Sequence, residues 1–353
     1  MRRSPHLRRP ALLAVVLSLA TSLTACGLLS GSSDDVPSQP TGQVEKPKLK
    51  VGVFSIVDVA PLYIALDNGY FKAEGLDVEP VTTAGGPDAV TKLAAGELDV
   101  GISSYPAFFA AQAKQVANFK IVTDAYQACD GHSRVMVRQD SPIQRPADLI
   151  GKKVAVSGRG TISDLAASSV LATHGVDPSK VQWIEIRFPD MLAGVQNGNV
   201  DAAVFGEPFV TQALQTKGTK DLFDIASGPT NEIALSGWGA LEKFVTANPR
   251  TVAAFQRAMA RAVDDTGDRP RLEQIFAGKL KIDPMVASLV TICRYPKTLE
   301  AKRIQRPADL MAEFGVIPRR ESPGSGERLA QLDVAPLLLS PPAPASSAAA
   351  PSR

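Results

Sequence analysis

Hydrophobic and polar positions along the chain alternate between short apolar runs and longer stretches with a helical period. The run Leu49–Phe54 has the length and composition of a buried strand, and a loop over 55–59 leads into an apolar stretch, Ala60–Asn68, that predicts a helix. A second strand follows Gly69, and a glycine-rich turn then places Pro87 where a helix favours proline, in its first turn. Strands that alternate with helices predict a parallel sheet covered on both faces.

The same order of elements recurs about one hundred residues later. A strand is predicted at Val154–Val156, a turn at 157–160, and a helix that begins near Thr161 or Ser163 and runs through Val170. Small residues allow a sharp turn, and the first turn of a helix has unpaired N–H groups that can bind an anion or a polar ligand.

Two short sequences make this recurrence a candidate repeat. Val51-Gly-Val-Phe aligns with Val154-Ala-Val-Ser, and Gly96-Glu-Leu-Asp aligns with Gly198-Asn-Val-Asp at nearly the same offset. Two similar α/β lobes are the simplest interpretation. Chance recurrence of common strand–turn–helix patterns is the alternative.

The 353 residues suit two lobes better than one core. We predict that lobe I comprises 48–132 and 238–318 and that lobe II comprises 133–237. The chain then crosses between the lobes twice, and two crossings make a hinge. A long helix with a buried face is predicted at 249–264.

The N-terminus has the features of a secretory signal, predicted for residues 1–25. Four arginines precede an apolar run over 11–23 that is too short for a good membrane span. The sequence that ends in Cys26, Leu-Thr-Ala-Cys, resembles the lipobox of bacterial lipoproteins. That resemblance implies cleavage before Cys26 and lipid on its thiol; a plain signal peptide with an incidental cysteine is the alternative.

Residues 26–47 are rich in Gly, Ser and Pro and predict a flexible linker. Residues 319–353 form a C-terminal extension that we expect to be largely disordered from about 341. Two cysteines remain in the exported part of the chain. Cys129 and Cys293 either form a disulfide or stay as two unpaired, buried thiols.

Charge and composition exclude several classes of function. The formal net charge is +2 and the basic residues are dispersed, which argues against a nucleic-acid partner. Neither His132 nor His174 has metal-ligand spacing, so we predict no metal and no cofactor. The turn that contains Gly158 lacks the Lys-Ser/Thr ending of a phosphate loop, and no Gly-x-Ser-x-Gly elbow occurs. The chain is therefore not predicted to be an enzyme.

Several motifs together resemble a known family. Gly69-Tyr-Phe-Lys-Ala-Glu-Gly-Leu-Asp-Val is similar to a signature of the aliphatic-sulfonate, nitrate and thiamine-precursor binding proteins of ABC importers. Gly85-Gly-Pro, Ala95-Gly-Glu-Leu-Asp-Val-Gly, Ala147-Asp-Leu-Ile-Gly and Val200-Asp-Ala-Ala-Val-Phe-Gly-Glu-Pro follow in the family's order. The resemblance implies a type II periplasmic-binding-protein fold, in which two α/β lobes joined by a two-crossing hinge hold one ligand between them.

In such sheets, ligands bind beyond the carboxyl ends of the strands. Carried over position by position, the resemblance gives these candidate ligand-binding residues: Phe54, Ser55, Thr83, Gly85, Gly86, Ser103, Ser104, Tyr105, Ser157, Gly158, Gly160, Thr161, Asp190, Phe205 and Glu207.

Each candidate has a purely structural alternative. The residues of the second turn are also suited to turn and cap positions, and Arg159 either pairs with an anionic ligand or is solvated. Asp190 is a helix N-cap or a ligand acceptor. Glu207 accepts an N–H from the ligand or braces the hinge. Aromatic residues such as Trp238 belong to the core unless they line the cleft, where they would favour a flat ligand.

The resemblance implies an extracytoplasmic, lipid-anchored solute-binding protein that delivers a small organic nutrient to the permease and ATPase subunits of an ABC importer. The ligand class is a sulfonate, a pyrimidine or another heteroaromatic nutrient. A ligand-sensing partner of a membrane receptor is one alternative. An enzyme of the pyrimidine-precursor or menaquinone type is another, although the first carries a cysteine-rich iron motif absent here, and the export signal argues against the second.

Overall fold

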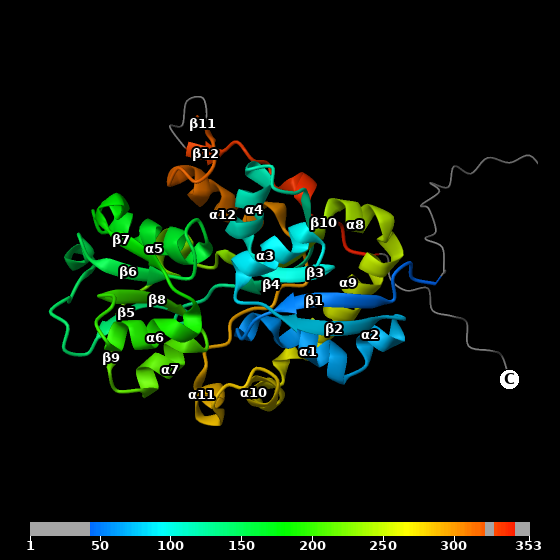
Figure 1. Ribbon diagram of the computed structural model, residues 1–353, viewed down its shortest axis with the longest axis horizontal. Helices are drawn as coiled ribbons and strands as arrows, with labels where there is room; N and C mark the ends of the chain where they lie inside the picture. Colours follow the sequence, from blue (N-terminus) through cyan, green and yellow to red (C-terminus); the bar gives the residue numbers. More distant parts are fainter. Residues whose placement is uncertain (1–42, 322–327, 343–353) are drawn as a thin grey trace, which may run out of the picture. The chain divides into compact units, whose positions relative to one another are not determined.

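The computed structural model describes residues 43–321 and 328–342 and contains one five-stranded sheet in each lobe (Figure 1). The lobe I strands are β1 (Lys48–Val53), β2 (Asp77–Thr82), β3 (Val100–Ser104), β4 (Phe119–Gln127) and β10 (Ala234–Leu241). The lobe II strands are β5 (Ser133–Arg138), β6 (Lys153–Val156), β7 (Gln182–Glu185), β8 (Ala202–Gly206) and β9 (Thr219–Asp224). The strand orders are β2-β1-β3-β10-β4 and β7-β6-β8-β5-β9.

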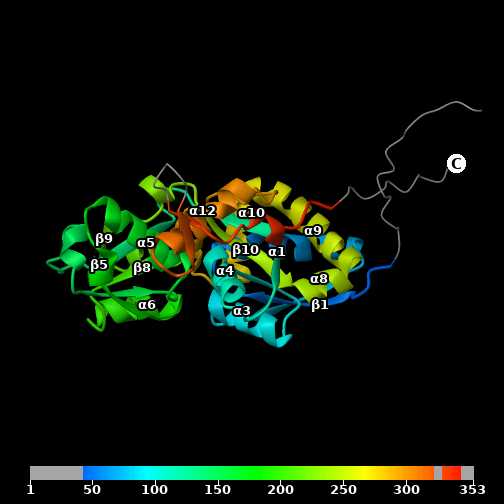
Figure 2. The ribbon, with the colours of Figure 1, turned by 90° about the horizontal axis from the view of Figure 1, so that it is seen from above.

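Helices cover both faces of the lobe I sheet (Figure 2). The helices that precede β10 are, in lobe I, α1 (Ala60–Asp67), α2 (Tyr70–Ala73), α3 (Gly86–Ala95) and α4 (Tyr105–Ala113). In lobe II they are α5 (Ile162–Thr173), α6 (Phe188–Gln196) and α7 (Phe209–Gln215). Those that follow β10 are α8 (Glu242–Ala247), α9 (Pro249–Asp264), α10 (Arg269–Gly278), α11 (Pro284–Leu289) and α12 (Ala301–Glu313). A short hairpin, β11 (Arg319–Glu321) and β12 (Arg328–Ala330), follows α12. The predicted helix over 249–264 matches α9.

The two sheets pair their equivalent strands in the same way. In lobe I, Val51 lies opposite Val100 in the parallel pair β1–β3, and in lobe II, Val154 lies opposite Ala202 in the parallel pair β6–β8. In each sheet the next strand is antiparallel and is supplied by a crossing segment, β10 in lobe I and β5 in lobe II. The predicted repeat therefore corresponds to a repeated strand order.

One aspartate makes the same contact in both lobes. Asp99, in the Gly-Glu-Leu-Asp turn, accepts a hydrogen bond from the backbone N–H of Lys50 at 3.0 Å. Asp201, in the Gly-Asn-Val-Asp turn, accepts one from the backbone N–H of Lys153 at 2.8 Å. Each carboxylate satisfies an N–H at the start of its central strand, where no neighbouring strand residue is available. The repeated aspartate therefore helps to fix strand register.

The hydrophobic core follows the alternation of the strands. In lobe II, Val135 and Val154 pack on one face of the sheet, whereas Met136 and Ala155 pack on the other. Because successive side chains of a strand point to opposite faces, a run of consecutive apolar residues fills both cores at once. This explains why these strands lack a polar side.

The first crossing joins β4 to β5 and the second joins β9 to β10. The predicted lobe boundary between 237 and 238 is wrong, because it cuts β10. This strand begins at Ala234 and pairs with β3 and β4 in the lobe I sheet. The apolar pattern over 233–240 predicts a strand, but a fully buried strand carries no signal of which sheet it joins. The crossings run together, since Gly131 donates its N–H to Asp224 at 2.5 Å.

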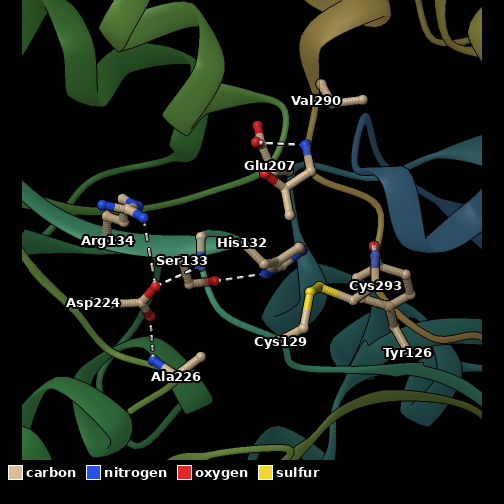
Figure 3. The surroundings of a disulfide bond; sticks show 12 residues. Tyr126, Cys129, His132, Ser133, Arg134, Glu207, Asp224, Ala226, Val290 and Cys293 are labelled. Carbon is tan, nitrogen blue, oxygen red and sulfur yellow. Dashed lines mark hydrogen bonds and ion pairs between the residues drawn. A yellow bond between two sulfur atoms is a disulfide. The ribbon is translucent and has the colours of Figure 1, made fainter.

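A disulfide joins Cys129 in the first crossing to Cys293 in the segment that follows α11 (Figure 3). Further hydrogen bonds hold this segment on β4 of lobe I. The Cys293 N–H donates to the Tyr126 hydroxyl at 2.6 Å, and Gln127 donates its N–H to the Arg294 carbonyl at 3.0 Å. The hinge therefore consists of two chain crossings and a third segment, 290–295, attached covalently to the first.

The predicted linker over 26–47 extends too far. The Glu45 carboxylate accepts hydrogen bonds from the backbone N–H and the hydroxyl of Thr251, at 2.8 and 2.9 Å, in the first turn of α9. Arg250 donates to the same carboxylate at 2.8 Å. Composition predicts flexibility but does not reveal that one acidic side chain caps a distant helix. The predicted signal peptide and Cys26 lie outside the described residues.

The C-terminal extension packs on lobe I in the part that the structure describes. The Leu339 N–H donates to the Ile121 carbonyl at 3.1 Å, and Gln256 donates to the Ser340 carbonyl at 3.2 Å. Lobe I therefore includes residues beyond 318, where the predicted lobe ends.

Candidate functional site

A cavity of about 100 Å³ lies between the lobes, beyond the carboxyl ends of strands from both sheets. The loop after β1 and the segment between β2 and α3 line it from lobe I. The turn after β6, the start of α6 and the end of β8 line it from lobe II. In open α/β sheets this edge is where ligands bind, because the loops there converge on a crevice.

Eight of the predicted ligand-binding residues line this cavity. They come from both lobes and from five separate segments of the chain, so the structure brings together positions that are distant in sequence. These residues are Phe54, Gly85, Gly86, Ser104, Ser157, Thr161, Phe205 and Glu207.

The other predicted residues lie outside the lining, and three of them have polar partners elsewhere. Thr83 donates its hydroxyl hydrogen to the Val53 carbonyl at 3.2 Å, and the Tyr105 hydroxyl donates to Asp124 at 2.8 Å. Asp190 is neither an N-cap nor part of the lining: Arg187 is the N-cap of α6, and it pairs with Asp190 at 2.7 Å. Position after a strand predicts proximity to the crevice but not the direction of a side chain.

The remaining predicted residues are neighbours of the lining in sequence or in space. The Ser103 hydroxyl is buried next to Gly86, where an added Cβ would lie 2.5 Å from it. Gly160 has a φ of +70°, which favours glycine, and an added Cβ there would lie 3.2 Å from Val316. Two further predicted residues, Ser55 and Gly158, are adjacent to lining residues without belonging to the lining.

Four helices begin at the cavity. Gly86, Ile162 and Phe188, the first residues of α3, α5 and α6, all line it, and so does Ser104, the N-cap of α4. The first N–H groups of a helix lack internal partners and carry a partial positive charge. Their convergence gives the cavity several donors suited to an oxyanion or a carbonyl oxygen.

Three hydroxyls at the start of α5 form a cluster on the lobe II wall. Ser157 Oγ lies 2.9 Å from Ser163 Oγ, and Thr161 Oγ1 lies 2.9 Å from the same atom. The Thr161 hydroxyl donates to the Gly158 carbonyl at 2.7 Å. Arg159 points away from this cluster, because it pairs with Asp164 at 3.3 Å and lies over the Trp183 ring.

Glu207 lines the cavity, but its carboxylate is already occupied. It accepts hydrogen bonds from the backbone N–H and the hydroxyl of Thr211, at 3.1 and 2.8 Å. It also accepts one at 2.9 Å from the backbone N–H of Thr291, in the segment 290–295. Burial raises the pKa of Glu207, and these donors act against that rise. Of its two predicted roles, the contacts favour the hinge brace, through hydrogen bonds instead of a salt bridge.

His132 lines the cavity from the first crossing, beside the disulfide (Figure 3). Its Nδ1 lies 2.8 Å from Ser133 Oγ, whereas its buried Nε2 has no hydrogen-bond partner among the described residues. Burial lowers the pKa of His132 to about 4, so the ring is neutral at pH 7. A neutral imidazole with one free nitrogen can donate to or accept from a bound molecule.

Asp58 lies on the lobe I wall in the loop after β1. The Ser236 hydroxyl donates to its Oδ2 at 2.5 Å, and both residues line the cavity. Burial raises the pKa of Asp58 to about 6. Neither Asp58 nor Ser236 is among the ligand-binding residues predicted from the sequence. Asp58 could have been predicted, because it lies four residues after Phe54 in the loop that follows the first strand. Ser236 could not, because it lies 178 residues further along the chain and no local pattern connects it with Asp58.

Neither a metal nor a membrane-spanning helix is indicated by the described residues. Within 43–321 and 328–342, no group of three or more His, Cys, Asp or Glu side chains is arranged to hold a metal ion. In the same ranges, no helix combines the length and apolar character needed to span a bilayer.

Comparisons with known proteins agree with this geometry. The chain is 29% identical over 194 residues to the taurine-binding periplasmic protein of Escherichia coli K12, covering 54% of this chain and 58% of that protein. It is 29% identical over 143 residues to the formylaminopyrimidine-binding protein of Halalkalibacterium halodurans, covering 40% of this chain and 42% of that protein. The matches thus span less than two thirds of the length of these two relatives.

A similar solved structure is the alkanesulfonate-binding protein from Xanthomonas axonopodis pv. citri bound to MOPS. It has a TM-score of 0.68 at 19% identity and covers 84% of this chain and 99% of that chain. The predicted fold, two α/β lobes of the type II periplasmic-binding class, is confirmed. A family model described as "NMT1/THI5 like" matches residues 56–272, which is more than half of the chain. The chain therefore belongs to the NMT1/THI5-like family.

Proposed function

We propose that this protein is an extracytoplasmic solute-binding protein that captures a small organic molecule between its lobes and delivers it to an ABC importer. The observation that carries the proposal is the cavity between the lobes, where four helix starts and the loops of both sheets converge. The taurine-binding periplasmic protein and the formylaminopyrimidine-binding protein among its relatives support the same role.

The cavity chemistry supports a ligand that is partly apolar and carries an acidic or carbonyl group. Side chains of Phe54, Phe188 and Phe205 line it together with aliphatic residues. Aromatic faces favour a flat or hydrocarbon part of a ligand, and helix starts with hydroxyls favour an oxygen-rich part. Sulfonates, pyrimidines and other heteroaromatic nutrients remain the ligand classes that we propose.

Capture would use motion of one lobe against the other. The two lobes approach each other beside the cavity, since an added Cβ on Gly158 of lobe II would lie 3.3 Å from Pro87 of lobe I. A ligand that touches both walls binds the closed arrangement better than the open one and shifts the population towards it. Closure excludes water, and the closed form would dock on the permease.

The sequence that resembles a lipobox supports the proposal that the protein is anchored to the membrane by lipid. Lipid on Cys26 would hold the protein at the outer face of the cell membrane, or in the periplasm of a cell with two membranes. Burial of lipid chains contributes about 0.8 kcal/mol per methylene, so two or three chains make a stable anchor.

A thermal-shift panel of sulfonates, nitrate, pyrimidines and aromatic acids tests the binding claim. A ligand present at about one hundred times its Kd adds about 2.7 kcal/mol of stability, which raises the Tm by several degrees. Chromatography of each incubated mixture distinguishes binding from chemistry. Stabilisation with recovery of the unchanged compound supports solute capture, whereas consumption of a compound without stabilisation would favour an enzyme.

A further inference from the structure

Four carboxylate side chains are buried in the described part of the chain, and one of them stands apart. Asp124 pairs with Arg303, and Asp164 pairs with Arg159. Glu207 accepts three hydrogen bonds from protein donors. Asp58 accepts hydrogen bonds from the Ser236 hydroxyl and from its own backbone N–H, and it forms no ion pair with any described Lys, Arg or His.

This difference matters because Asp58 is also at the cavity wall. A carboxylate has about four acceptor positions, and leaving a buried charge without a partner is costly. The side chain of Asp58 is held in place rather than free to turn outwards: Ser236 holds its Oδ2, and the Tyr295 hydroxyl donates to the carbonyl of the adjacent Val57 at 2.9 Å. Asp58 therefore presents unused acceptor capacity at a fixed position.

His132 is a second polar group of the cavity lining, and one of its ring nitrogens has no hydrogen-bond partner among the described residues. His132 is 5% exposed, lines the cavity, and its Nε2 has no hydrogen-bond partner among the described residues. Buried polar atoms are nearly always hydrogen-bonded in folded proteins, so an orphan atom at a cavity wall indicates a missing partner. Asp58 belongs to lobe I and His132 to the first crossing, so these two cavity-lining groups come from other segments than the hydroxyl cluster of α5.

We propose that Asp58 is the cation subsite of the cavity and that the physiological ligand carries a protonated amine or a strongly polarised N–H group. This inference rests on the proposed solute-binding function and names the ligand group that it selects. The ammonium or N–H group donates to Asp58 beside Ser236, and His132 offers a further hydrogen-bonding position. The oxygen-rich end of the ligand then faces the helix starts. A charge-assisted bond in this water-poor site is stronger than a neutral one.

Matched ligand pairs that differ only in the amine test the subsite. Suitable pairs are taurine with ethanesulfonate, β-alanine with propionate, and an aminomethylpyrimidine with the corresponding hydroxymethylpyrimidine. Isothermal titration of the wild-type protein is expected to show the amine-bearing member binding about tenfold or more tightly in each pair that binds. The variant Asp58→Asn, which keeps the shape and removes the charge, is expected to abolish this preference.

Asp140→Asn is the matched control, because Asp140 is exposed on lobe II and lies outside the cavity lining. It is expected to keep the wild-type preference. Equal or tighter binding of the amine-free members to wild-type protein overturns the inference and leaves solute binding intact. If no member of any pair binds, both the inference and the proposed capture of these solute classes fail. If Asp58→Asn does not fold, the ratio of the two dissociation constants within each ligand pair, measured on wild-type protein, tests the inference by itself.

Discussion

Lobe I and lobe II are built alike but carry different chemistry on the walls that face each other. Both sheets have the same strand order, and both use an aspartate at the start of a central strand, Asp99 and Asp201. At the cavity, however, lobe I presents the carboxylate of Asp58 and lobe II presents a cluster of hydroxyls around Ser163. The repeated strands and turns build the scaffold, whereas the side chains that we propose to select the ligand differ between the two walls.

The lobes also differ in what is added to them. Lobe I receives five helices after β10, an N-terminal segment that contains Glu45, and the C-terminal segment 328–342. The segment 290–295 then attaches lobe I to the first crossing and, through Thr291, to Glu207 of lobe II. Lobe I is therefore the larger and more heavily braced lobe, and three sets of substitutions test that difference.

The largest effect is expected from the disulfide, which ties lobe I to the hinge. Replacing both cysteines, Cys129→Ala with Cys293→Ala, removes a cross-link between residues separated by 164 positions. Native disulfides contribute about 2–4 kcal/mol to stability. We expect a loss of that size in the free energy of unfolding, measured by urea titration. Reduced wild-type protein is the control and should lose the same amount. An unchanged free energy would mean that the non-covalent contacts of 290–295 suffice.

The second largest effect is expected from replacing the two repeated aspartates, one in each lobe. Asp99→Ala and Asp201→Ala each leave the backbone N–H of a lysine without its carboxylate partner. A hydrogen bond of this kind contributes about 1 kcal/mol. We expect similar losses in the two lobes, slightly larger for Asp99, which also pairs with Lys46 at 2.6 Å. Urea unfolding of both variants beside the exposed Asp140→Ala checks this. If only one of the two variants lost free energy of unfolding, the two aspartates would not have equivalent roles in their lobes.

The smallest effect concerns Glu45, which only lobe I has. Burial acts to raise the pKa of Glu45, but hydrogen bonds from Thr251 and Arg250 outweigh it and lower the pKa from the ordinary 4.5 to about 2. The ionised carboxylate therefore stabilises the fold above pH 4.5, and this contribution is lost as the pH falls towards 2. Replacing a helix cap costs about 1 kcal/mol.

The difference in unfolding free energy between wild type and Glu45→Gln is thus expected to be largest near pH 7 and to shrink below pH 4.5. Equilibrium unfolding at pH 7, 4.5 and 3 measures it. A difference that stays constant over this range would show that Glu45 acts through packing and not through its charge.

Most of the fold could be predicted because strand and helix periods are local properties. The run Leu49–Phe54 predicts a strand, and β1 spans Lys48–Val53. The lobe boundary could not be predicted as well, because a fully buried strand such as β10 fits either sheet, and only the pairing of Trp238 with Ile102 decides. Sequence pattern therefore gives the elements more reliably than their partners.

The site could be predicted in outline for the same reason. Residues that follow strands, such as Gly85 and Ser157, do line the cavity. The direction of individual side chains depends on tertiary contacts: Tyr105 turns into the core because Asp124 accepts its hydroxyl hydrogen. Asp58 and Ser236 come together only through the folding of two distant segments. Local patterns locate the crevice, and only the folded chain shows which polar groups remain free in it.

The most direct test of the account is native mass spectrometry of freshly purified protein together with one cavity-filling variant from each lobe, Ser104→Trp and Ser157→Trp. Both serines line the cavity. We predict one small molecule bound to each wild-type chain, and none bound to either variant while its circular dichroism spectrum stays native. Wild-type protein that binds no small molecule from growth medium or from the ligand panel, or folded variants that retain the bound molecule, would contradict capture between the lobes.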